Sequence, residues 1–301
     1  MPASRPKPSS NSPMLVYIAS LPHSGSTLLS LLLAKHPHVV ALGEVRLQIA
    51  KIRRDTDKAS EGTCGCGSRI GSCDLWGRFI KEHSASAKPV EDLQLVARIL
   101  RELHGPDVVM VDASKIREPV EELAADRKLP VRVLHLSRDY RSWIVSAADL
   151  RRRKAKSVRP GWWLGFEGAR RWVRENRKLD CAIAASGFPS MRLGYEELVL
   201  APDKVWPELW RFLDLPAAPV PRDVAGARNH IFSGNRMREN EERRAVTYDN
   251  RWFTRHEWRA CAATVPRMAS LNRRWTYSHG FAGEGRKEEL VRLAASHGFE
   301  P

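Results

Sequence analysis

Short, fully apolar segments alternate along the chain with stretches whose apolar residues recur at helical spacing. The pattern predicts three consecutive strand–helix pairs: 15–20 with 27–35, 108–111 with 118–126, and 131–137 with 140–150. Buried strands that alternate with helices form a parallel sheet covered on both faces. We therefore predict a doubly wound α/β fold, in which ligands bind beyond the carboxyl ends of the strands.

The pattern continues toward the C-terminus with two interruptions. It predicts a long helix over 161–186, a strand over 190–193 and another helix over 254–275. Two stretches without clear periodicity, 60–83 and 214–245, are expected to be insertions, and the second could act as a mobile lid.

Length and composition indicate one globular unit. A chain of 301 residues, 43% hydrophobic and 28% charged, can bury a sizeable core. We expect one domain over 14–301, preceded by a flexible Pro/Ser tail at 1–13. The longest apolar stretch is far shorter than the roughly 20 residues of a membrane helix, so we expect no membrane span and a cytoplasmic protein with reduced cysteines.

The net charge of +15 would attract acidic partners. Nucleic acid, an anionic membrane or a polyanionic cofactor would each satisfy it, and a solvated Arg-rich surface would also explain it. Net charge alone does not distinguish these partners, whereas sequence motifs can.

A turn of small residues follows the first predicted strand and leads directly into a helix. It includes Ser24, Gly25, Ser26 and Thr27. Backbone N–H groups at such a helix start can cradle an anion, and glycine permits close approach. The alternative is an ordinary strand-to-helix turn. The turn lacks the Gly-Lys pair of the ATPase loop, which disfavours a P-loop kinase.

A second anion site is expected after the strand at 131–137. Arg138 ends this strand, and Ser146 lies two turns into the following helix, so both could converge on one phosphate.

The first motif, Pro22-x-Ser24-Gly25-Ser26-Thr27-Leu28, resembles the 5′-phosphosulfate loop of the sulfotransferases that use 3′-phosphoadenosine-5′-phosphosulfate (PAPS). Arg138-Asp139 followed by Ser146 resembles that family's 3′-phosphate motif. The resemblance implies a P-loop-like sulfotransferase fold that requires no metal. PAPS would be the donor, and its desulfated form 3′-phosphoadenosine-5′-phosphate (PAP) would be the product. On this resemblance, residues 24–27 bind the 5′-phosphate and sulfate, and Arg138 and Ser146 bind the 3′-phosphate.

The same resemblance suggests the catalytic groups. Glu44, in Gly43-Glu44-Val45-Arg46, resembles the proposed base of related enzymes, with Arg46 pairing with it or holding an acidic acceptor. Lys115, which ends Asp112-Ala113-Ser114-Lys115, would stabilise the sulfate and the bridging oxygen. Asp112 also permits a Walker B interpretation. His23 stands where the family usually has Arg or Lys, and a protonated His23 could stabilise charge.

Weaker motifs complete the predicted cofactor site. Tyr195, in a strand-end Tyr-Glu-x-Leu, is expected to contact the nucleotide. Arg236 and Arg238, in a Gly-Asn-x-x-Arg loop, are expected to fold over its phosphates.

A cysteine-rich segment contains Cys64, Cys66 and Cys73. A structural zinc site needs four ligands, and His83 is only a distant candidate for the fourth. We expect no metal and an acceptor-side or structural loop, with zinc as the alternative.

The sequence leaves the acceptor open. A basic run from Arg151 to Lys154, followed by Trp162 and Trp163, could bind nucleic acid, although a solvated helix end is the commoner role. We expect a small-molecule or peptide hydroxyl acceptor and no nucleic acid. A kinase or a non-catalytic nucleic-acid-binding protein is the alternative, and the oligomeric state is unknown.

Overall fold

A computed structural model describes most of the chain. The described residues are 14–115, 117–154, 160–233, 245–259, 261, 265, 267–279 and 286–299. The expected tail at 1–13 and the expected cofactor-loop residues Arg236 and Arg238 lie outside them.

The centre of the molecule is a five-stranded parallel sheet, which confirms the predicted fold class. Its strands are β1 (Leu15–Ser20), β2 (Val39–Gly43), β3 (Val109–Lys115), β4 (Val131–Ser137) and β5 (Ser190–Gly194), in the order β2-β3-β1-β4-β5. The connection from β1 leads toward β2, whereas β4 lies on the other side of β1. The carboxyl ends of β1 and β4 therefore flank the point at which the direction of winding reverses, where ligands of open α/β sheets bind.

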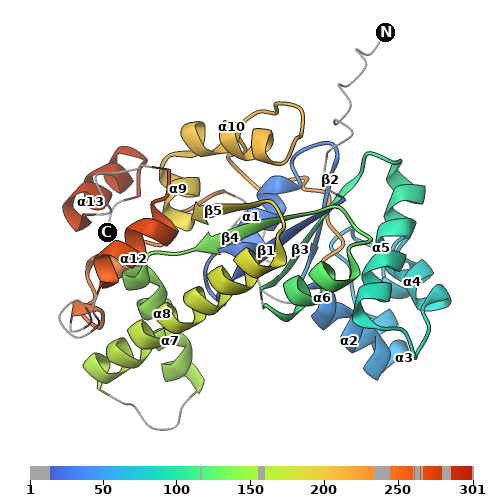
Figure 1. Cartoon of the computed structure of the whole chain (residues 1–301), viewed down its shortest axis with the longest axis horizontal. Coiled ribbons are helices and arrows are strands. Elements are labelled where there is room, and N and C mark those ends of the chain that lie inside the picture. The colour runs from blue at the N-terminus through green and yellow to red at the C-terminus, as the bar shows by residue number, and fades with distance from the viewer. Residues whose placement is uncertain are drawn as a thin grey trace.

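Helices cover both faces of the sheet (Figure 1). Alternate residues of β1 belong to two core clusters: Leu15 and Tyr17 face one layer, and Val16 and Ile18 face the other. The layer over Leu15 and Tyr17 contains α2 (Val45–Arg54), α4 (Trp76–Glu82), α5 (Pro89–His104), α6 (Glu118–Asp126) and α8 (Gly161–Ser186). The layer over Val16 and Ile18 contains α1 (Ser26–Leu33), α9 (Tyr195–Leu200), α10 (Pro202–Phe212) and α13 (Lys287–Ser296).

The remaining elements also contribute residues to the core or connect the layers. They are α3 (Thr56–Ser60), the 3-10 turns η1 (Ile70–Ser72) and η4 (Arg251–Phe253), α7 (Tyr140–Lys154) and α12 (Met268–Thr276). Among the described residues, no helix combines the length and apolar character needed to cross a membrane.

One predicted element is wrong over much of its length. Helix was expected over 254–275, but α12 begins only at Met268. Residues 254–258 are turns or irregular structure, in which the Glu257 carboxylate binds Arg152 and Arg255. Arg259 and Cys261, farther along the predicted range, are helical.

Gly165 allows α8 to pack closely against the segment that follows η4. A Cβ atom at this position would lie 1.8 Å from the carbonyl oxygen of Glu257, and backbone cannot yield as a flexible side chain can. We expect Gly165→Ala to reduce the free energy of unfolding by about 1–3 kcal/mol through this clash. Urea denaturation measures the effect.

Gly161→Ala is the matched control in the same helix. Its Cβ would lie 3.3 Å from the flexible Cγ of Glu257, so we expect a neutral or slightly stabilising change. Equal effects of the two substitutions would contradict the close helix–backbone contact.

Candidate functional site

The turn between β1 and α1 has an unusual backbone. His23 and Gly25 both have positive φ angles, +70° and +91°. A Cβ at Gly25 would lie 2.8 Å from the Tyr195 ring, so glycine is needed both for the left-handed conformation and for the close packing of Tyr195. Tyr195 thus contacts the turn itself.

Two side chains donate hydrogen bonds to carbonyl oxygens of this turn. Trp143 donates its indole N–H to the Pro22 carbonyl at 2.8 Å, and Arg138 donates to the His23 carbonyl at 3.0 Å. The N–H groups in the first turn of any helix have no intrahelical acceptor, and at the N-terminus of α1 no side chain caps them. Ser24 and Ser26 are buried in the turn, and Thr27 is half-buried. The arrangement suits an anion.

Arg138 connects this turn with three other segments. Its Nε donates to Ser142 Oγ at 2.9 Å, its Nη2 donates to Asp249 Oδ2 at 2.6 Å, and its guanidinium lies 4.8 Å from the centre of the Tyr195 ring. It is only 6% exposed. The hydroxyl in contact with Arg138 is therefore that of Ser142, one turn before the predicted Ser146, which is also buried on α7.

Asp249 shares its carboxylate between Arg138 and Arg251. Burial alone would raise the pKa of Asp249, but the hydrogen bonds from Arg251 and the charge of Arg138 outweigh it and hold the pKa well below its usual range. The carboxylate is thus ionised at neutral pH, and a phosphate that binds Arg138 has to compete with it.

Two buried acidic residues, Asp139 and Glu196, form hydrogen bonds at the carboxyl end of β4, next to Arg138. Asp139 accepts two hydrogen bonds from the Arg141 guanidinium, at 2.8 and 2.6 Å, and one from the Tyr277 hydroxyl at 2.8 Å. Glu196 accepts the Asp139 backbone N–H at 3.0 Å. Burial, and next the negative charge of Asp139, raise the pKa of Glu196 to about 8. Glu196 is therefore largely protonated at neutral pH, while Asp139 is ionised.

Glu44 and Lys115 meet at the neighbouring strand ends. Lys115 Nζ donates to Glu44 Oε1 at 2.6 Å, and the two side chains are 15% and 23% exposed. The pair is accessible enough to meet a ligand. Lys115 has a positive φ of +73°, which turns the chain at the end of β3.

Asp112 and Ser114 hold the helix start that carries Glu44. Asp112 Oδ1 accepts the Ser114 N–H at 2.8 Å and the Val45 N–H at 3.3 Å, and Ser114 Oγ accepts the Arg46 N–H at 3.3 Å. These bonds satisfy N–H groups of the first turn of α2. Asp112 therefore serves to position Glu44, unlike the magnesium-binding Asp of the Walker B interpretation.

The structure bears on two expectations about charged side chains. Arg46 pairs with Glu122 on α6, so it is not the partner of Glu44. His23 is accessible, but desolvation, followed by the charges of Arg138 and Lys115, lowers the pKa of its imidazole. The lowered pKa disfavours the protonated form of His23, and Arg138 and Lys115 are permanent or strong cations whose charges act on the same turn.

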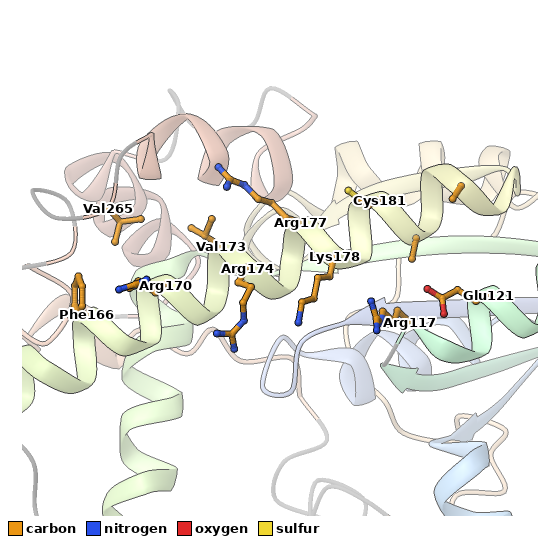
Figure 2. A pocket seen from close by; sticks show the side chains of 12 residues that line it. Arg117, Glu121, Phe166, Arg170, Val173, Arg174, Arg177, Lys178, Cys181 and Val265 are labelled. Atoms are coloured by element: carbon orange, nitrogen blue, oxygen red, sulfur yellow. The ribbon is translucent and has the colours of Figure 1, made fainter.

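The basic run on α7 is partly neutralised. Arg151 pairs with Glu167, and Arg152 pairs with Glu257. A separate groove of about 930 Å³ runs along α8 and reaches Arg117 (Figure 2). Five of the twelve residues that line it are basic: Arg117, Arg170, Arg174, Arg177 and Lys178. None of the predicted site residues lines it.

Sequence reasoning missed several residues of the site. Ser142 and Trp143 lie in the segment of the second anion motif, so their position one turn after Arg138 was a usable signal. Asp249 and Arg251 carry no motif, and only the folded chain brings them to Arg138.

The chain is similar to solved structures, but it matches no known sequence family. No profile of a known protein family matches the chain, nor does any curated protein. Among solved structures, the sulfotransferase domain from the curacin biosynthetic pathway is 19% identical, with a TM-score of 0.49 over 96% of this chain and 98% of its own. The sulfotransferase domain from the Synechococcus PCC 7002 olefin synthase is 18% identical, with a TM-score of 0.43 over 99% of both chains.

A third solved structure is sulfotransferase STF9 from Mycobacterium avium. It is 13% identical, with a TM-score of 0.41 over 70% of this chain and 66% of its own. At these values we record the likeness and take the function from the residues of the site.

The raised pKa of Glu196 makes stability depend on pH. Because the folded pKa is about 8 and exceeds the ordinary value of 4.5, the protonated acid stabilises the fold fully below pH 4.5, and this contribution is lost as pH rises through 8. We expect Glu196→Gln, a neutral mimic, to gain stability relative to the native chain between pH 5.5 and 8.5, by on the order of 1 kcal/mol per pH unit.

Urea denaturation at three pH values across this range measures the gap between the two proteins. Parallel pH profiles would contradict a protonated Glu196. Asp139→Asn is the contrasting variant, because it leaves the buried Arg141 without its ionic partner, and we expect a loss of about 3–5 kcal/mol.

Proposed function

We propose that this protein is a sulfotransferase of the PAPS-dependent family, which moves a sulfuryl group from PAPS to the hydroxyl group of a small-molecule or peptide acceptor. One observation carries the proposal: Arg138 is hydrogen-bonded to the anion-binding turn, while a Lys115–Glu44 pair stands at the neighbouring strand ends. The turn, two cations and a carboxylate base are what sulfuryl transfer needs.

The proposed donor lies along the carboxyl ends of the strands. Residues 24–27 bind its 5′-phosphate and sulfate through the open N–H groups of α1. Arg138, with Ser142 and the neighbouring Ser146, binds the 3′-phosphate, which displaces the Asp249 carboxylate from the guanidinium. Arg251 retains Asp249 when Arg138 releases it, since both cations already share this carboxylate.

The proposed chemistry uses groups already in contact. The acceptor oxygen attacks the sulfur as its proton passes to Glu44, and the bond from sulfur to the bridging oxygen breaks, leaving PAP. Lys115 stabilises the negative charge that grows on that oxygen. Such in-line transfer depends mainly on position and charge, so no covalent intermediate is needed.

The same observations disfavour a nucleotide kinase. The turn carries no lysine to reach terminal phosphates. Asp112, the residue that could have held magnesium, already accepts hydrogen bonds from Ser114 and Val45 through Oδ1.

PAP binding without metal tests the donor site. A charge-assisted hydrogen bond contributes about 1.5–3 kcal/mol, so we expect Arg138→Ala to weaken PAP binding by roughly 10–100-fold. Calorimetric titration measures this. Arg222→Ala is the control, because Arg222 forms an exposed pair with Asp203 and should leave PAP affinity unchanged. Preference of the native protein for Mg-ATP, or equal PAP binding by Arg138→Ala, would sink the assignment.

The base is tested by Glu44→Gln, which keeps the shape of the side chain but cannot take a proton. We expect turnover of radiolabelled PAPS with a panel of phenol, sugar, alcohol and tyrosyl-peptide acceptors to fall about 10²–10⁴-fold. PAP affinity should change little, because Glu44 faces the acceptor. A variant that retains native turnover would refute the role of Glu44.

A further inference from the structure

Four potential metal ligands gather on the outer side of β2, from two segments far apart in the sequence. Cys64, Cys66 and Cys73 come from the insertion before α4, and His230 comes from the segment that runs beside β2. Their four ligand atoms all lie within 4.8 Å of one another. Cys64, Cys73 and His230 are buried, whereas Cys66 is exposed.

His83, the fourth ligand considered from sequence, is not part of this cluster. Its ring stacks on Phe79, and its Nδ1 lies 3.0 Å from the Ile80 carbonyl oxygen.

Four of the six distances between ligand atoms can be compared with the edges of a tetrahedron around one ion, and the other two are below 4.8 Å. With Zn–S of about 2.3 Å and Zn–N of about 2.0 Å, two sulfur ligands are about 3.8 Å apart, and a sulfur and a nitrogen about 3.5 Å. The Cys64–Cys73 and Cys66–Cys73 sulfur separations are 3.7 and 3.8 Å. His230 Nδ1 lies 3.7 Å from the Cys64 sulfur and 3.2 Å from that of Cys73.

The backbone around the cluster is arranged for thiolates. The N–H of Cys66 donates to the Cys64 sulfur, and the N–H of Trp76 donates to the Cys73 sulfur. Such bonds orient and stabilise thiolate ligands. Gly65 is required because a Cβ there would lie 1.7 Å from Asn229 Oδ1, and Gly67 turns the chain with a φ of +92°.

We propose that Cys64, Cys66, Cys73 and His230 bind one structural zinc ion with closed, tetrahedral S₃N coordination. Thiolate and imidazole ligands select zinc, and four protein ligands leave no position for a substrate. All five cysteines of the chain are free thiols in the structure, so these sulfurs are available as ligands. The proposal replaces the expectation of no metal.

The ion would fix the position of the 228–233 segment, which lies beside Glu44, the proposed base. His230 donates its backbone N–H to Ala41 of β2 at 2.9 Å, and Phe232 donates to the Gln48 side chain on α2 at 2.7 Å. Ile231 packs against Gly43, where a Cβ would lie 2.9 Å from it. Gly43 directly precedes Glu44, so zinc holds the cysteine insertion and the 228–233 segment together beside Glu44.

Metal analysis of the full-length protein tests the site independently of any activity. Protein purified without chelator from zinc-supplemented cells should contain about one zinc ion per chain by elemental analysis. Cys66→Ser and His230→Ala should lose most of it. Because Cys66 is exposed, its substitution should leave the fold intact, and circular dichroism checks this. His230→Cys, which restores four ligands, should retain zinc.

Cys181→Ser is the matched control, since Cys181 is an exposed cysteine outside the cluster, and it should retain full zinc. Replacement of zinc by Co²⁺ should produce thiolate-to-cobalt charge-transfer absorption and the ligand-field bands of a tetrahedral site. Removal of zinc by a chelator should lower the Tm of the native protein by more than about 5 °C, with no such shift in His230→Ala.

Several outcomes would overturn the proposal. One is a zinc-free native protein whose cluster thiols all react with a thiol reagent without a chelator. Another is a Cys64–Cys73 or Cys66–Cys73 disulfide in the freshly purified protein, found by mass spectrometry. Stoichiometric iron in place of zinc, or full zinc in His230→Ala, would also refute the assignment.

Discussion

The candidate site depends most on the guanidinium of Arg138, which is buried and bonded in every direction. One nitrogen holds a carbonyl of the anion-binding turn, a second holds a hydroxyl of α7, and the third pairs with Asp249, while Tyr195 covers one face. A buried charge needs such a set of partners. Four separate segments of the chain are thereby brought to one point, next to the first turn of α1, whose N–H groups no side chain caps.

Two buried acidic residues next to Arg138, Asp139 and Glu196, differ in protonation state. Asp139 is charged because Arg141 binds it in a fork, whereas Glu196 is neutral because it is buried beside that charge. Two ionised carboxylates could not share this interior. The proton on Glu196 therefore lets β4 and α9 pack together while the motif residues on both, Arg138 and Tyr195, stay in contact.

The position of Glu44 depends on contacts at the start of helix α2. Asp112 and Ser114 satisfy the N–H groups at its start, Lys115 pairs with Glu44, and the 228–233 segment packs against Gly43. The proposed zinc ion would anchor that segment to the cysteine insertion. The proposed donor site and the proposed base thus have separate structural supports: a buried ionic network for the donor site and a proposed metal cross-link for the base.

The sequence by itself determined the parallel α/β sheet, the small-residue turn between β1 and α1, and the placing of Arg138, Lys115 and Glu44 at strand ends, because strand–helix alternation and small-residue turns are local patterns. The structure alone decided that Arg138 meets Ser142 and Asp249, that Arg46 pairs with Glu122, and that His230 joins three cysteines. The physical reason is sequence distance: His230 lies 166 residues from Cys64, and only the packing of both segments beside β2 brings their side chains together.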